Sequence, residues 1–241
     1  MYVELKNINK NFGDYKASDN VNFGVEKGKL IGLLGPSGSG KTTILRMIAG
    51  LETPDSGDII IDGVRVNDLA ASKRGIGFVF QNYALFRYMT VYDNIAFGLR
   101  VQKADKKKID ERVRELIKLI GLEGLEKRYP SQLSGGQRQA LALIMATMIR
   151  PDLLLLDEHT AALDPKSSDT VMMLTDKLVH EKNITTIMVT HNLRHAVEHG
   201  TRTVMMHNGE AIMDVSGAEK ENKTINDYLT VFNEIRIECG N

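Results

Sequence analysis

Residues 35–43, GPSGSGKTT, have the residue types and the spacing of a phosphate-binding loop. They fit the pattern G-x-x-x-x-G-K-[ST] through Gly35, Gly40, Lys41 and Thr42. Glycines let successive backbone N–H groups point at one anion, and the start of a helix adds partial positive charge there. We expect Lys41 to lie against the β- and γ-phosphates of a nucleotide and the Thr42 hydroxyl to bind Mg²⁺. The residues predicted to bind the nucleotide in this loop are Gly35, Pro36, Ser37, Gly38, Ser39, Gly40, Lys41, Thr42 and Thr43. The alternative is a glycine-rich turn before a structural helix.

Two acids, Asp157 and Glu158, directly follow the leucine run of residues 153–156. Carboxylates at the carboxyl end of a central parallel strand lie where ligands bind in open α/β sheets. We predict that Asp157 holds Mg²⁺ and that Glu158 orients or deprotonates an attacking water. The alternative is a pair of acids that cap the next helix.

The elements that must position these residues have the patterns of an α/β core. The apolar run before the glycine loop fits a buried parallel strand, and apolar residues after the loop recur at helical spacing. Core strands are predicted at residues 30–34, 76–80, 153–156 and 185–190, with helices at 167–181 and 194–199. Alternating and turn patterns predict an opening strand at 2–8, a strand through 21–23, a hairpin at 58–63 and a terminal hairpin around 208–209.

The character of the chain changes between residues 82 and 150, where helical patterns dominate. Residues 104–120 predict an amphipathic helix, and residues 137–149 predict a second helix that is apolar almost all round. A short closing helix is predicted from Thr224 to about Ile235, with Asp227 completing a T-x-x-D capping pattern.

Composition bounds the class of protein. The chain has 241 residues with 31 basic and 31 acidic side chains, so its formal net charge is zero and nothing indicates a nucleic-acid partner. A single cysteine, Cys239, excludes a disulfide within the chain. No apolar run approaches the roughly 18 residues needed to span a bilayer, so we expect any membrane span to come from another chain.

Residues 133–137, LSGGQ, are the signature sequence of ATP-binding cassette (ABC) proteins, and the chain resembles the nucleotide-binding subunit of an ABC transporter over residues 1–215. Other family motifs match in order. Phe12 fits the aromatic that stacks on adenine, Gln81 fits the Q-loop, Asp164 closes a D-loop and His191 fits the switch histidine. Each of these residues has an alternative role when it is considered alone. Phe12 could be a core residue, with Tyr15 as the other candidate for stacking on adenine. Gln81 could be an ordinary surface residue, and His191 could have a structural role.

The resemblance implies an α/β fold, with a P-loop NTPase core, an N-terminal antiparallel β subdomain and an inserted helical subdomain. It places the core at 1–81 and 151–216, the helical subdomain at 82–150 and a helical tail without a regulatory domain at 217–241. It implies ATP and Mg²⁺ as cofactors. The implied roles are catalysis by Glu158, His191 and Gln81, metal binding by Thr42, Gln81 and Asp157, and nucleotide binding across a dimer by Ser134, Gly135, Gly136, Gln137 and Asp164.

The resemblance also implies partners. In the family the signature of one subunit closes on the ATP held by the other, which makes a head-to-tail pair about a two-fold axis. We expect a homodimer that docks integral membrane permease subunits through residues 82–98, is served indirectly by a solute-binding protein, and lies at the cytoplasmic face of the membrane. The alternatives are an ABC ATPase without transport and an ATP-dependent binding switch.

Several residues depart from the family pattern. His159 stands where most importers have proline, Ala161 replaces the usual D-loop serine, and Ala140 and Met145 stand where arginines are common. None of these removes a phosphate, metal or water ligand, so we predict an active ATPase. Residues 78–101 resemble the sulfate-importer subgroup, and residues 137–217 resemble another importer subgroup, as natural divergence or a recombinant combination would produce.

Overall fold

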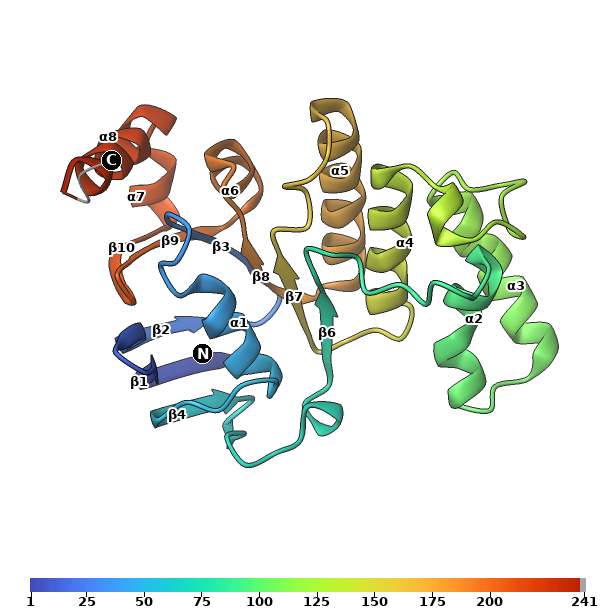
Figure 1. Ribbon diagram of the computed structural model, residues 1–241, viewed down its shortest axis with the longest axis horizontal. Helices are drawn as coiled ribbons and strands as arrows, with labels where there is room; N and C mark the ends of the chain where they lie inside the picture. Colours follow the sequence, from blue (N-terminus) through green and yellow to red (C-terminus); the bar gives the residue numbers. More distant parts are fainter. Residues whose placement is uncertain (239–241) are drawn as a thin grey trace.

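The computed structural model describes residues 1–238, and it contains two sheets with helices packed between and beside them (Figure 1). The single cysteine, Cys239, lies outside the described residues. Within the described part of the chain, no helix is long and apolar enough to cross a membrane.

The first sheet is antiparallel and has the strand order β2-β1-β4-β5. Its strands are β1 (Val3–Phe12), β2 (Tyr15–Val25), β4 (Ser56–Ile61) and β5 (Val64–Arg65). Alternate residues of β1 face the core, because successive side chains of a strand point to opposite faces. The strand runs four residues beyond the predicted end at residue 8, up to the Gly13-Asp14 turn.

The second sheet has the order β10-β9-β3-β8-β7-β6 and carries the predicted chemistry. Its strands are β3 (Leu30–Leu34), β6 (Ile76–Val79), β7 (Leu153–Asp157), β8 (Thr185–Val189), β9 (Arg202–His207) and β10 (Glu210–Ser216). All neighbours pair in parallel except β9 and β10, which form the terminal hairpin. The carboxyl ends of β3, β7 and β8 therefore meet at one edge, where α/β sheets bind ligands.

Helix α1 (Lys41–Ala49) lies between the two sheets and joins them (Figure 1). Its apolar face, with Ile44 and Ile48, packs in one buried cluster with Leu5 of β1 and Leu155 of β7. The glycine loop is thus fixed at both ends, by the buried strand β3 before it and by this buried helix after it.

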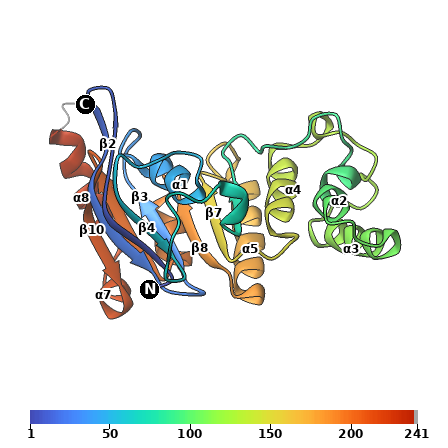
Figure 2. The ribbon, with the colours of Figure 1, turned by 90° about the horizontal axis from the view of Figure 1, so that it is seen from below.

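The helices of the insertion form the end of the molecule opposite α8 (Figure 2). They are α2 (Val91–Val101), α3 (Lys106–Leu119) and α4 (Gly135–Thr147), with a 3₁₀ turn at Pro130–Gln132 before α4; another 3₁₀ turn, at Ala71–Lys73, precedes β6 in the core. Helix α4 begins and ends two residues before the predicted 137–149, because Ser134 caps it. Helix α2 was not predicted.

The remaining helices pack on the second sheet, and they are α5 (Pro165–Lys182), α6 (Leu193–His199), α7 (Gly217–Glu221) and α8 (Ile225–Glu238). Tyr228 of α8 is fully buried against Leu34, Ala196 and Met205, so the tail covers β3 and β9 beside α6. The predicted T-x-x-D cap is present, because the Asp227 carboxylate accepts from the Thr224 backbone N–H at 2.6 Å.

Candidate functional site

A cavity of about 450 Å³ opens at the glycine loop, a size typical of a small-molecule site. Its lining comes from the first sheet, from the loop and the start of α1, and from the loops after β6 and β7. Apart from Tyr15, every lining residue is one that the sequence predicted: Phe12, Ser37, Gly38, Gly40, Lys41, Thr42, Thr43, Gln81 and Glu158.

The loop backbone has a shape that only glycine permits at Gly40. Its φ is +93°, and an added Cβ would lie 1.9 Å from the Ala17 carbonyl oxygen of β2. The first sheet therefore presses directly against the loop. Residues with positive φ at this point let consecutive N–H groups converge into an anion-binding cradle.

Lys41 lies at the floor of the cavity and is only 4% exposed. Its ammonium donates to the carbonyl oxygens of Gly35 and Pro36, at 2.9 and 2.7 Å, and to the Ser39 hydroxyl at 3.1 Å. Burial lowers the pKa of Lys41 from 10.5 to about 8, although the nearby carboxylates of Glu158 and Asp157 act in the opposite direction. A buried cation without a direct ion pair is a strong attractor for a polyphosphate.

Thr42 and Asp157 make a second feature of the site. The Thr42 hydroxyl donates to Asp157 Oδ1 at 2.8 Å, which brings the end of β7 to the start of α1. Burial raises the pKa of Asp157, and so does the neighbouring charge of Glu158, although the Thr42 hydrogen bond acts in the opposite direction. Both causes favour a cation beside this carboxylate.

Glu158 is held on both of its carboxylate oxygens. Gln81 Nε2 donates to Oε2 at 3.0 Å, and His191 Nε2 contacts Oε1 at 2.5 Å. The three residues follow β6, β7 and β8, three neighbouring strands, so the sheet order itself assembles them. Glu158 has a φ of +48°, a left-handed conformation that costs about 1–3 kcal/mol for such a residue and is common at functional sites.

Two aromatic residues flank the cavity at the tip of the β1–β2 hairpin. Phe12 is 47% exposed, and the Lys10 ammonium lies 5.1 Å from its ring centroid. Tyr15 is 49% exposed, and its hydroxyl donates to the Gly38 carbonyl oxygen. Sequence reasoning named Tyr15 only as a rival stacker, and its bond to the loop could not be read from the chain.

The signature residues lie elsewhere. Ser134 and Gln137 form a reciprocal cap at the start of α4, with bonds of 3.3 and 2.9 Å. Gly136 packs against Ser167 at the start of α5, whose cap is Asp164. None of the signature residues lines the cavity, so one chain does not bring its own signature to its own glycine loop.

The segment 82–98 divides into packed and exposed side chains. Val91 is fully buried, and Tyr83, Leu85 and Tyr92 pack against the helical core, so the expectation that the whole aromatic stretch forms a surface is wrong for these four. They belong to the core because α2 begins at Val91, capped by Thr90. Exposed aromatic rings remain at Tyr88, Phe86 and Phe97.

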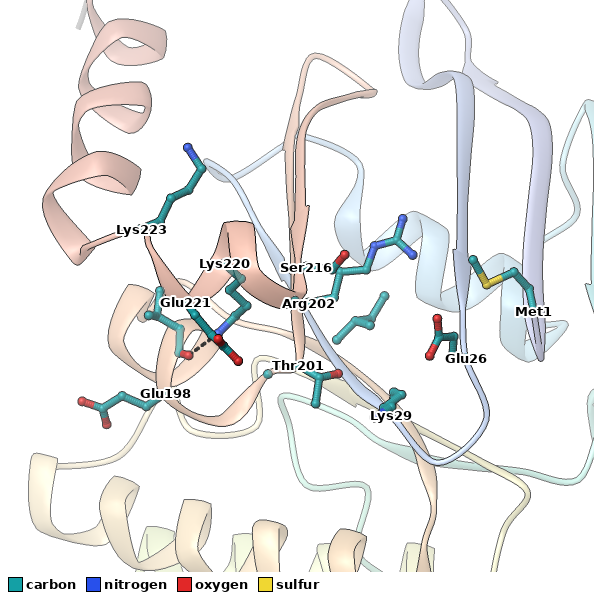
Figure 3. A pocket seen from close by; sticks show the side chains of 14 residues that line it. Met1, Glu26, Lys29, Glu198, Thr201, Arg202, Ser216, Lys220, Glu221 and Lys223 are labelled. Atoms are coloured by element: carbon teal, nitrogen blue, oxygen red, sulfur yellow. Dashed lines mark hydrogen bonds between the residues drawn. The ribbon is translucent and has the colours of Figure 1, made fainter.

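A larger cavity, of about 910 Å³, lies at the amino ends of the parallel strands, away from the glycine loop (Figure 3). Two of its basic residues, Arg202 and Lys220, are engaged within the protein. Arg202 pairs with Asp214 and donates to the Gly24 carbonyl at 2.6 Å, and Lys220 donates to the Val197 carbonyl. No residue of the glycine loop lines this larger cavity.

The fold and the site define a P-loop nucleotide-binding protein of the cassette type, with a second sheet against the loop and a helical insertion. Consistent with this class, residues 18–161 match the ABC transporter family. The chain belongs to that family, and it is an ATP-binding, ATP-hydrolysing subunit.

Comparison with individual proteins gives the same family assignment. The chain is 46% identical to a probable sulfate/thiosulfate import ATP-binding protein CysA of Chlorella vulgaris, over 96% of this chain and 98% of that protein. It is 45% identical to the protein named CysA in Pectobacterium atrosepticum, over 96% of this chain and 72% of that protein. Among solved structures it resembles the dimeric bacterial ABC transporter cassette MJ0796, with a TM-score of 0.81 and 33% identity over 89% of this chain and 98% of that one. A post-hydrolysis dimer of the same cassette, bound to ADP and Pi, matches with a TM-score of 0.80 and 34% identity.

Proposed function

We propose that this chain hydrolyses ATP at the cavity beside Lys41 and that Glu158 is the residue that orients and deprotonates the attacking water. The observation that carries the proposal is the fixed carboxylate of Glu158, held by Gln81 and His191 at the mouth of the glycine-loop cavity. A general base must be positioned within hydrogen-bond reach of its proton, and two partners on its two oxygens supply that positioning.

The glycine loop binds the phosphates in this proposal. Its backbone N–H groups and the start of α1 face one region, and Lys41 adds the full positive charge. The charged form of Lys41 is favoured by bound phosphate, which offsets the effect of its burial.

The residues fit Mg²⁺ as the metal. The Thr42 hydroxyl and the Asp157 carboxylate are adjacent oxygen donors, and no group of three His, Cys, Asp or Glu side chains within residues 1–238 forms a closed metal cage. Mg²⁺ binds in this way, through one or two protein oxygens with phosphates and water completing its shell. When bound, it neutralises the charge that develops on the phosphates, with Gln81 as a further oxygen donor from the strand beside β7.

Phe12 is proposed to stack on adenine. Its ring is half exposed beside the cavity, and Lys10 approaches it closely. Lys10 is itself fixed by Glu52 at 2.9 Å and by the Thr53 carbonyl at 2.8 Å, so the aromatic ring has a firm support. Tyr15 then stabilises the glycine loop through the hydrogen bond from its hydroxyl to the Gly38 carbonyl oxygen.

Two chains make the complete site in this proposal. Ser134, with the N–H groups of Gly135 and Gly136, offers a second helix N-terminus for phosphate, but it is absent from the cavity of its own chain. A head-to-tail pair supplies each glycine loop with the partner's signature and with contacts from Asp164. The dimeric cassette MJ0796 supports this arrangement.

The pair is proposed to drive import through separate membrane permeases at the cytoplasmic face of the membrane. The importer names of the relatives favour this function over an ABC ATPase without transport or a binding switch. Their names also indicate sulfate or thiosulfate as the imported solute, delivered to the permeases by a solute-binding protein. The exposed rings of Tyr88, Phe86 and Phe97 are the proposed docking surface for the permease, because aromatic residues are enriched at interface centres.

The test is Glu158→Gln. It should lower the turnover number by on the order of 10²-fold or more, since loss of a general base typically has that effect, while the affinity for an ATP analogue stays close to that of the wild type. Glu181→Gln, at the far end of α5, is the matched control and should hydrolyse ATP normally. A Glu158→Gln chain with wild-type turnover would exclude Glu158 as the base.

A further inference from the structure

A buried polar cluster lies beneath the loops that carry Glu158 and His191. His159 is 2% exposed and directly follows Glu158. We propose that His159 is a positioning residue for ATP hydrolysis, because its hydrogen bond to Thr175 of α5 anchors the Glu158 loop. The inference rests on the role proposed above for Glu158.

The hydrogen bonds define which atom of His159 carries the proton. The Thr175 hydroxyl donates to the Val171 carbonyl at 2.8 Å, so its oxygen has only acceptor capacity left. His159 Nε2 lies 3.2 Å from that oxygen, and with the hydroxyl proton on the Val171 carbonyl we assign Nε2 as the N–H donor. The ring is neutral, since burial lowers the pKa of His159 to about 3. In the part of the chain that the structure describes, its Nδ1 has no hydrogen-bond partner.

The Glu158 loop needs such an anchor. Glu158 has a left-handed φ of +48°, which persists only where the surroundings restrain it. Two backbone hydrogen bonds of 3.0 Å restrain it. The Glu158 N–H donates to the Val189 carbonyl, and the Ala161 N–H donates to the Glu158 carbonyl. His159 adds a side-chain anchor one residue from the catalytic carboxylate, and it does not line the cavity.

The same cluster reaches the second catalytic loop. Helix α6 begins at Leu193, two residues after His191. Its His195 approaches the Thr160 hydroxyl at 3.5 Å, and its His199 is hydrogen-bonded to Asp176 of α5. Helix α5 therefore contacts the Glu158 loop through Thr175, and through Asp176 it contacts helix α6, which follows His191. A rigid common support keeps Glu158 and His191 at their contact distance.

The experiment compares four variants of the full chain by steady-state ATPase kinetics and by titration with an ATP analogue. His159→Leu should lower kcat roughly tenfold, because misplacement by a fraction of an ångström at a catalytic group has effects of this order, with KM and analogue affinity unchanged. His159→Gln places an amide N–H where Nε2–H was, and should recover most of the lost kcat. Thr175→Val removes the acceptor and should match His159→Leu, and the double variant should lose no more than either single one.

Thr170→Val is the matched control, because the Thr170 hydroxyl makes the same bond to its own helix, at 2.9 Å to the Lys166 carbonyl, on the exposed face of α5. It should leave kcat unchanged. A second readout needs no nucleotide: nitrogen NMR spectra of the free protein should show His159 as the Nε2–H tautomer, and Thr175→Val should shift that resonance.

The outcomes separate the two proposals. Wild-type kcat in both His159→Leu and Thr175→Val would overturn the anchoring role while leaving Glu158 in place. A combined loss of kcat, analogue affinity and melting temperature that His159→Gln does not restore would make His159 a packing residue only. Thr175→Val keeps the test decisive if His159→Leu does not fold. Full hydrolysis by Glu158→Gln would overturn the proposed base and this inference with it.

Discussion

ATP binding should weaken as the pH rises above 8, because the free protein then loses the proton of Lys41. Its pKa is about 8 instead of 10.5, and the cause is burial at 4% exposure among backbone carbonyl groups. Bound phosphates favour the ammonium form and raise this pKa again. Binding above pH 8 must therefore take up a proton from solution.

The size of the loss in ATP affinity follows from the pKa of Lys41 in the nucleotide-free protein. If the pKa of Lys41 is far higher with nucleotide bound, the affinity for ATP falls by the factor 1 + 10^(pH − pKa), where pKa is that of Lys41 in the free protein. With a pKa of about 8, that is about twofold at pH 8 and about tenfold at pH 9, or roughly 1.4 kcal/mol. The last ionisation of a phosphoryl group has a pKa near 6, so the nucleotide itself changes little in this range.

The assay is calorimetric titration with a non-hydrolysable ATP analogue at pH 7, 8 and 9, in buffers of different ionisation enthalpy. Proton uptake should rise from about 0.1 at pH 7 to about 0.9 at pH 9. Lys41→Arg is the control, because a guanidinium stays protonated throughout and its binding, although weaker, should not change with pH. A wild-type affinity that stays constant from pH 7 to 9, without proton uptake, would refute the buried, low-pKa lysine.

Two further predictions follow from the same structure. Gly40→Ala should destabilise the fold by about 2 kcal/mol or more in urea unfolding and abolish nucleotide binding, since its methyl would overlap the Ala17 carbonyl at 1.9 Å. Gly63→Ala, with positive φ but open space, should lose only about 1 kcal/mol, and equal losses would contradict the overlap. Tyr88→Glu, at a side chain 95% exposed, should reduce solute uptake by a reconstituted transporter while the isolated subunit keeps its ATPase activity. Val64→Glu, exposed on β5, should change neither, and loss of folding or ATP binding in Tyr88→Glu would exclude docking there.

The central part of the site could be predicted from the sequence because each piece is local. A strand, a glycine loop and a helix follow one another over residues 30–49, and the acids follow the leucines of β7 without a gap. The parallel order of β3, β8 and β7 then brings these local pieces to one edge. The fold class, the family and the ATPase activity are confirmed, whereas the roles of individual site residues stay predictions.

Other features depend on contacts that sequence periodicity does not reveal. Helix α2 is hard to recognise in the sequence because its aromatic residues resemble an exposed surface, although Thr90 and Asp93 form a T-x-x-D cap. The bond from Tyr15 to Gly38 joins the first sheet to the glycine loop, and the His159 cluster joins residues from the loop after β7 and from α5 and α6. Such contacts are set by packing between elements far apart in the chain. The sequence therefore shows that the histidines are present but does not predict which residues they contact.

The measurement closest to the central claim is the oligomeric state of Glu158→Gln in MgATP, determined by sedimentation. If each site needs the glycine loop of one chain and the signature of another, this variant should sediment as a dimer with MgATP and as a monomer without it. Adding Ser134→Arg to Glu158→Gln should abolish the dimer while each chain still binds an ATP analogue. A Ser134→Arg chain that dimerises as before, or a Glu158→Gln chain that stays monomeric in saturating MgATP, would contradict a site shared between two chains.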